Sequence, residues 1–234
     1  MAVFKSAIGT ISGKIGGLVY RNRNGKTYVS KAPRAGTRSF DPERQKRENK
    51  FGMSIKIASA IYGNTTLKQI WANESGKSKG AVHNIIMKEI YSQLDESNPT
   101  DIGCILPNFG FELGGQIKFR EKELFIETTD FGSSIQIDFA KEKMLQATGI
   151  IIMADPGNHN DTPLTVYPIN SGIMQVNECK ALTFSIQMYA TNLVSYLSYQ
   201  KQGVYLSLVT LDSEGNAVHY SEGIKGLDDR TIKI

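Results

Sequence analysis

Apolar and polar positions follow two different periods along this chain of 234 residues. Between residues 41 and 98 apolar side chains recur every three to four positions, which is the period of an amphipathic helix. From about residue 101 onwards they alternate with polar residues in short runs, which is the period of a half-buried strand. We therefore expect an α+β protein in which the helices precede the sheets.

Three helices are expected in the segment 41–98. The first begins at Asp41-Pro42-Glu43, where a capping carboxylate precedes a proline at the first helical position. It ends at Gly63-Asn64, and its apolar positions are Phe51, Ile55, Ala58 and Ile61 or Tyr62. A shorter helix covers Thr66–Ala72, and the polar linker Glu74–Gly80 follows it. The third helix ends at Asn98-Pro99, and its apolar stripe consists of Val82, Ile85, Ile86, Ile90 and Leu94.

The segment 99–234 is expected to be an antiparallel β-sandwich of immunoglobulin-like architecture. Its apolar runs are short, are separated by turn residues and show almost no helical period. The predicted strands are Gln116–Arg120, Leu124–Thr128, Ile135–Phe139, Gly149–Met153, Leu164–Tyr167, Leu182–Tyr189, Val204–Leu211 and Ala217–Tyr220.

The first forty residues hold one readable element, a β-hairpin that turns at Asn24-Gly25. A two-residue type I′ turn requires positive φ at both central positions, which Asn and Gly tolerate. The turn fixes the register, so one face carries Leu18, Tyr20, Thr27 and Val29, and the other carries Val19, Arg21, Arg23, Lys26 and Tyr28. Because an isolated hairpin is marginal in water, we expect it to lean on the rest of the chain or on a partner.

Charge is distributed unevenly along the sequence. Residues 1–40 contain eight Lys or Arg and no acid, so this segment is a basic, Gly-rich arm. Residues 1–50 contain twelve basic and three acidic residues, a net charge of +9, whereas the remaining residues contain fifteen basic and twenty acidic residues, a net charge of −5. Part of the excess lies at the start of the first helix, in Arg44, Lys46, Arg47 and Lys50, where Glu43 is placed to pair with Arg47. Such asymmetry predicts a contact with an anionic partner or an acidic protein surface.

These patterns together predict three parts. They are a basic arm with a β-hairpin over residues 1–40, a helical segment over 41–98 and a sandwich domain over 99–234.

The segment Ile11–Pro33 resembles the opening of an uncharacterised family of small proteins from bacteroidete bacteria and their phages. Members of that family begin with a Gly-Lys-apolar-Gly stretch and a hairpin with an aromatic strand, followed by a proline. The segments Gln45–Phe51, Ser78–Asn84 and Val204–Gly223 are similar to later parts of the family pattern. The resemblance implies a shared fold and brings no catalytic residues with it.

Several short motifs resemble functional sites, but a structural explanation is favoured for each. Gly76-Lys77-Ser78 is similar to the end of a phosphate-binding loop, yet Trp71 stands where that motif requires a glycine. The loop Asp155–Asp161 gathers oxygen ligands without the regular spacing of a calcium loop, and turn residues explain it. The arm glycines are expected to adopt unusual φ angles rather than to line an anion; they are Gly9, Gly13, Gly16 and Gly17.

No catalytic constellation stands out in the sequence. The three histidines, His83, His159 and His219, lie in different segments, and neither Cys104 nor Cys179 has a base close to it along the chain. The cysteines form no CxxC pair, so two free thiols are favoured over a disulfide. We expect a protein that is not an enzyme and that needs neither a cofactor nor a metal ion.

The sequence also bears on location. It contains no run of about 18 apolar residues, and its first residues lack the continuous apolar stretch of a secretory signal. We expect no membrane contact and a place in the cytoplasm or in a virion.

Two functions of different classes follow from the basic arm. The preferred one is a structural assembly protein, a virion component or a subunit of a self-assembling particle, whose arm docks on another copy or on another assembly protein. The alternative is a sequence-tolerant nucleic-acid-binding protein whose contact residues are Arg21, Arg23, Lys26, Tyr28, Arg44 and Arg47. Assembly is preferred because no signature of a known nucleic-acid-binding fold is present.

Overall fold

The computed structural model describes residues 2–4, 12–32, 41–107, 110–119, 123–131, 137–156, 162–175, 178, 180–187 and 197–229. The chain forms two compact units, Met1–Pro42 and Glu43–Ile234.

The first unit contains a four-stranded antiparallel sheet with the strand order β1-β4-β3-β2. The strands are β1 (Ala2–Phe4), β2 (Gly13–Ile15), β3 (Leu18–Arg23) and β4 (Lys26–Lys31). The predicted hairpin is confirmed as β3–β4, since Asn24 and Gly25 have φ angles of 51° and 71° and Arg21 lies opposite Tyr28. The hairpin does not stand alone, however, because β1 pairs with β4 and β2 pairs with β3.

Glycine makes the turn between β2 and β3. Gly16 has a φ of 58° and Gly13 a φ of 120°, conformations that residues with a Cβ rarely adopt. The predicted use of the arm glycines is thus confirmed at these two positions, whereas Gly9 lies outside the described residues. The turn is fastened to the end of β4 by a hydrogen bond of 2.7 Å from the Ala32 N–H to the Gly17 carbonyl oxygen.

The second unit opens with three helices close to the predicted positions. They are α1 (Pro42–Gly63), α2 (Thr65–Ser75) and α3 (Lys79–Gln93). Asn64 caps α2, because its side-chain oxygen accepts hydrogen bonds from the backbone N–H groups of Thr66 and Leu67. Gly76 ends α2 with a φ of 58°, so the Gly76-Lys77-Ser78 segment is a turn between two helices.

Two antiparallel sheets follow the helices. The large sheet is built on β7 (Met144–Pro156) and β11 (Tyr199–Leu211), which pair with each other along their length. It is completed by β8 (Leu164–Asn170), β9 (Met174–Gln175), β12 (Ala217–Tyr220) and β13 (Ile224–Asp229). The small sheet consists of β5 (Gly115–Phe119), β6 (Glu123–Thr128) and β10 (Thr183–Gln187).

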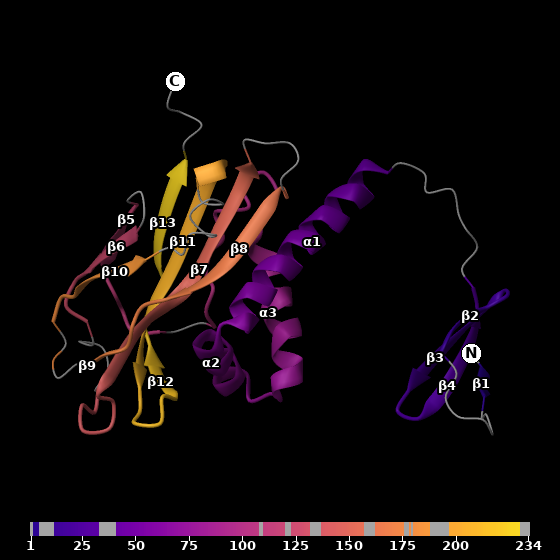
Figure 1. Cartoon of the computed structure of the whole chain (residues 1–234), viewed down its shortest axis with the longest axis horizontal. Coiled ribbons are helices and arrows are strands. Elements are labelled where there is room, and N and C mark those ends of the chain that lie inside the picture. Colours follow the sequence, from indigo (N-terminus) through magenta and orange to yellow (C-terminus); the bar gives the residue numbers. More distant parts are fainter. Residues whose placement is uncertain are drawn as a thin grey trace. The chain divides into compact units, whose positions relative to one another are not determined.

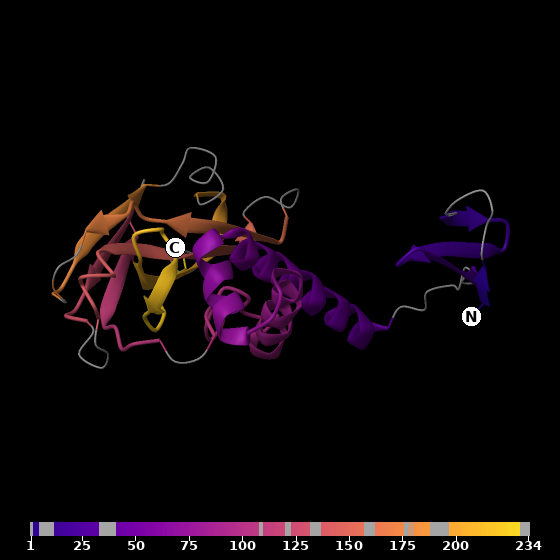
Figure 2. The ribbon, with the colours of Figure 1, turned by 90° about the horizontal axis from the view of Figure 1, so that it is seen from below.

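The large sheet is the middle layer of this unit. The helices lie on one of its sides and the small sheet on the other, as Figures 1 and 2 show. The large sheet has a hydrophobic core on each of its sides, and alternate residues of β7 point into one or the other. Ile150 and Ile152 pack with the helices, whereas Ile151 and Met153 pack with the small sheet. Both faces of β7 and β11 are therefore apolar.

The structure confirms the α+β class with antiparallel sheets and corrects several details. Ile137–Phe139, the described part of the predicted strand Ile135–Phe139, is not a strand, and β9 and β13 were not predicted. Phe51 and Ile55, which were placed on the apolar stripe of the first helix, are 47% and 36% exposed. Whether the two sheets form an immunoglobulin-like sandwich stays a prediction.

Candidate interaction surface

The register of the first unit places four cations on one face of its sheet. Arg23 lies opposite Lys26, Arg21 lies opposite Tyr28, and β2 brings Lys14 opposite Val19. We call this side, with Lys14, Arg21, Arg23, Lys26 and Tyr28, the cationic face. All four cations are exposed, Tyr28 is half-buried, and none of the four forms an ion pair with any described residue.

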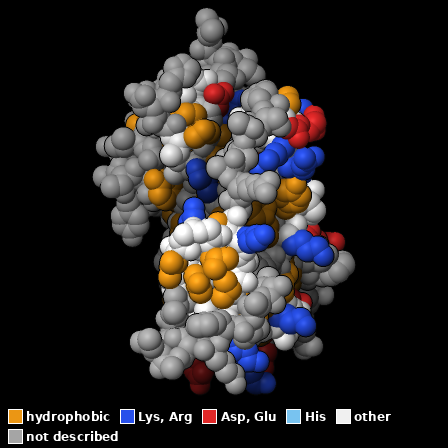
Figure 3. Space-filling model, turned by 90° about the vertical axis from the view of Figure 1, so that its right-hand side faces the viewer, with side chains coloured by type: hydrophobic (Ala, Val, Ile, Leu, Met, Phe, Trp, Pro, Cys, Tyr) orange, Lys and Arg blue, Asp and Glu red, His pale blue; other side chains and the backbone are white. Residues whose placement is uncertain are grey.

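The opposite side of the same sheet carries four apolar residues on β2, β3 and β4 beside the polar residues Asn22, Thr27 and Lys31. Leu18, Tyr20 and Val29 share it with Ile15, which β2 places opposite Leu18. We call this side the apolar face. Ile15 is 58% exposed and Leu18 is 38% exposed. Figure 3 shows one side of the molecule, where exposed hydrophobic side chains lie beside Lys and Arg side chains.

The helix cations of the predicted surface belong to the second unit. Arg44 donates from Nε to Glu48 Oε1 at 2.9 Å, so its charge is partly neutralised at the surface. The predicted pairing of Glu43 with Arg47 is replaced by a pairing of Glu43 with Lys46 at 3.5 Å. The structure thus brings Arg21, Arg23, Lys26 and Tyr28 together on the first unit, whereas Arg44 and Arg47 lie on α1 of the second unit.

Lys14 was missed in the sequence, although a signal for it existed. Gly16-Gly17 is a two-residue turn between Ile15 and Leu18, and Gly-Gly is one of the dipeptides that favour such hairpins. Counting outwards from that turn would have placed Lys14 on the cationic face.

Comparisons with known proteins add no function. No family model matches the chain, and no curated protein matches it. A solved structure assigned as ApaA, from Bordetella pertussis, is 7% identical and covers 54% of this chain and 100% of its own, with a TM-score of 0.28. That similarity is too low to carry an argument.

The second unit contains one polar cluster that the sequence did not reveal. Glu142 is 4% exposed; its Oε2 accepts a hydrogen bond from the Thr210 hydroxyl at 2.6 Å and lies 2.8 Å from His219 Nδ1. Burial raises the pKa of this carboxyl, but the hydrogen bonds from Thr210, His219 and the Asp138 backbone outweigh it, so the pKa is lowered.

This cluster has a structural task. The register of β11 and β12 shifts between Val209 and Leu211, and at that irregularity the His219 N–H donates to the Thr210 hydroxyl at 3.0 Å. Glu142 therefore ties β11 to β12 at this irregularity in their pairing. Its side-chain partners are Thr210 on β11 and His219 on β12, and the Asp138 backbone N–H donates to its Oε1 at 3.1 Å.

The remaining sequence candidates gain no chemistry from the structure. Among the described residues, no group of three or more His, Cys, Asp or Glu side chains is close enough together to hold a metal ion. Most of the Asp155–Asp161 loop, with His159, lies outside those residues, as does Cys179. His83 Nε2 lies 3.2 Å from the Ser59 hydroxyl, and Cys104 is a free thiol.

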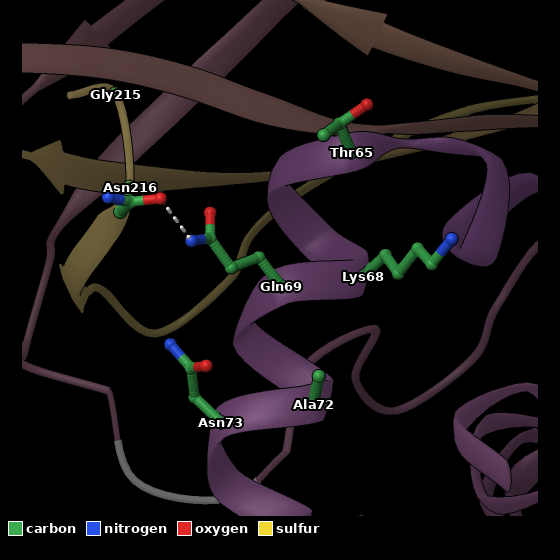
Figure 4. A pocket seen from close by; sticks show the side chains of 7 residues that line it. All are labelled: Thr65, Lys68, Gln69, Ala72, Asn73, Gly215 and Asn216. Carbon is green, nitrogen blue, oxygen red and sulfur yellow. Dashed lines mark hydrogen bonds between the residues drawn. The ribbon is translucent and has the colours of Figure 1, made fainter. Parts of the chain in front are cut away.

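A pocket of about 370 Å³ lies between α2 and the loop that joins β11 to β12. In Figure 4, Gln69 and Asn216 point towards each other from its two walls, and they are joined by a hydrogen bond of 3.0 Å. Gln69 also accepts from the Ala217 N–H. The amides thus satisfy each other and the loop backbone, so they hold the loop against α2 rather than converge on a ligand.

No helix in the described parts of the chain is long and apolar enough to cross a membrane.

Proposed function

We propose that this chain is a structural assembly protein whose N-terminal sheet docks by its apolar face on another copy of the chain. The observation that carries the proposal is the exposure of Ile15 and Leu18 on that face. Within residues 12–32, Thr27 alone is buried, at 3% exposure, and no apolar side chain of this stretch is buried. Strands β2, β3 and β4 thus bury no apolar side chain, whereas a sheet is normally stabilised by such a core.

A covering partner would stabilise this sheet directly. Complete burial of an Ile or Leu side chain contributes about 1.5–3 kcal/mol. With Ile15 58% and Leu18 38% exposed, covering both contributes roughly 2 kcal/mol to docking.

A second copy suits the arm by charge. The arm carries eight basic residues and no acid, whereas residues 51–234 have a net charge of −5, so the arm of one copy is attracted to the body of the next. Phe51 and Ile55 on α1 are exposed one turn apart and offer the arm an apolar acceptor. Contacts between two different surfaces build rings or open filaments, which suits a virion component or a particle subunit.

The wider proposal follows from this role. We infer that the two sheets within residues 99–234 form an immunoglobulin-like sandwich, that the chain is not an enzyme, and that it works in the cytoplasm or in a virion. The resemblance of Ile11–Pro33 to a family found in bacteroidete bacteria and their phages supports the virion setting.

The test is sedimentation velocity of the full chain over a hundredfold concentration range, at low and at high salt. We expect oligomers in the wild type and fewer in the double variant Ile15→Ser, Leu18→Ser. The matched control is Ile173→Ser, Leu227→Ser, because these side chains are 57% and 48% exposed on the second unit. A wild-type monomer at every concentration, or an equal loss of assembly in the control, would refute the proposal.

A further inference from the structure

The cations of the N-terminal sheet form a diagonal stripe across three strands. Lys26 on β4 lies opposite Arg23 on β3, and Arg21 is two residues before Arg23 on the same strand. Lys14 on β2 lies opposite Val19, which is two residues before Arg21. Successive same-face residues of a strand are about 6.6 Å apart, and neighbouring strands are about 4.8 Å apart. The stripe therefore spans roughly 16 Å, and successive cations along it are about 5 to 8 Å apart.

We propose that this cationic face is a binding site for single-stranded nucleic acid, with the stripe along the phosphates and Tyr28 as a platform for one base. The site lies on the opposite side of the sheet from the apolar face, so it does not rest on the proposed assembly function. One sheet can dock on protein with one face and hold nucleic acid with the other.

The charge of the face favours a polyanion. The segment 1–40 contains no acid, so no carboxylate within it can neutralise the stripe. The four cations are exposed and form no ion pair with a described residue, so counterions from solution surround them. A bound polyanion displaces counterions, and the entropy of their release favours binding.

The aromatic residue distinguishes nucleic acid from an acidic protein. Tyr28 lies directly opposite Arg21 and two residues from Lys26, in the middle of the stripe. Base stacking on an aromatic ring is insensitive to sequence and requires an unpaired base, which points to single strands.

The expected salt dependence follows from the number of cations. Four phosphate contacts on a single strand give a slope of about −2.8 in a plot of log affinity against log salt. Between 50 and 200 mM salt the affinity then falls about 50-fold.

The experiment is fluorescence anisotropy of the full chain with a labelled 20-nucleotide oligo(dT) at several salt concentrations. Replacing two cations in Arg21→Gln, Arg23→Gln should reduce the slope by about 1.4, and Arg21→Lys, Arg23→Lys should restore it. The control Lys77→Gln, Lys88→Gln removes two exposed charges from the second unit and should leave the slope unchanged.

The aromatic contribution has a matched pair of variants. Tyr28→Leu should weaken binding about 5- to 100-fold, whereas Tyr20→Leu, which changes a half-buried tyrosine on the apolar face, should not. The double variant Ile15→Ser, Leu18→Ser should bind oligo(dT) as the wild type does, so a failure of assembly and a failure of this site are distinguishable.

Three results would overturn the inference. They are no binding at 50 mM salt, an equal effect of Tyr28→Leu and Tyr20→Leu, and poly-glutamate of the same length binding as tightly as oligo(dT). The last would identify the stripe as a contact for acidic protein.

Discussion

Asn64 joins the helical layer to the large sheet, and its replacement should reveal what that junction contributes. The side chain is 2% exposed. Its oxygen caps α2, and its Nδ2 donates to the Thr148 hydroxyl at 2.8 Å and to Asn170 Oδ1 at 2.9 Å. One side chain thus starts a helix and fastens it to β7 and β8.

The expected cost can be separated into two parts. Loss of a cap costs about 1 kcal/mol, and each of the two donated hydrogen bonds contributes about 1 kcal/mol. Asn64→Ala should therefore lower the free energy of unfolding by about 3 kcal/mol, and Asn64→Ser, which keeps a capping oxygen, by about 2 kcal/mol. The exposed Asn73→Ala on α2 is the control and should change it by less than about 0.5 kcal/mol.

The protein contains its own reporter for this measurement. Trp71 is the one tryptophan of the sequence, is 5% exposed on α2 and donates from Nε1 to the Ile105 carbonyl oxygen at 3.0 Å. Urea unfolding followed by Trp71 fluorescence gives the free energy of unfolding of the wild type and of the three variants. Equal stabilities of Asn64→Ser and the wild type would show that the bonds to the sheet contribute nothing, and the reasoning would fail.

Three further changes test other parts of the structure. Gly149→Ala should abolish cooperative thermal unfolding by circular dichroism, because a Cβ there would lie 1.8 Å from the Tyr205 carbonyl oxygen; a normal melting curve would contradict the close approach. The lowered pKa of Glu142 means that its stabilising effect is complete above its ordinary value of 4.5 and is lost as the pH falls through the lower folded value. Glu142→Gln should thus destabilise the protein by about 1–3 kcal/mol at pH 7 and by less at pH 3, as measured by urea unfolding; an equal loss at both pH values would contradict this. Phe51→Ser should reduce self-association in sedimentation velocity while its melting temperature stays within about 2 °C, because the ring is 47% exposed; unchanged association would exclude α1 as the acceptor.

Local signals in the sequence predicted the local structure well. The Asn24-Gly25 turn, the start of α1 at Pro42 and its end at Gly63 depend on a few neighbouring residues, and the structure has them where they were expected, whereas α2 ends three residues later than expected and α3 ends at Gln93 instead of Asn98. For the same reason the two faces of β3 and β4 followed from counting alone. Turns and strand faces were predictable because the residues that determine them are neighbours in the sequence.

Long-range pairing was out of reach. Strand β2 has three residues and β1 has three, and each is a strand because of the neighbour it pairs with. The need for glycine at position 149 is visible only in the structure, where β11 lies so close that a side chain would not fit. The Glu142 cluster joins residues 68 and 77 positions apart, and no period or motif connects them.

The order of the layers along the chain has a consequence for synthesis. The helices end at Gln93, but β11, a central strand of the sheet that packs against them, ends at Leu211. A ribosome that adds 5–20 residues per second needs about 6–24 s to bridge that interval. During this time Ile57, Ile86 and Ile90 of the nascent helices are exposed. We therefore expect chaperones to bind the nascent chain and slower translation to increase its aggregation.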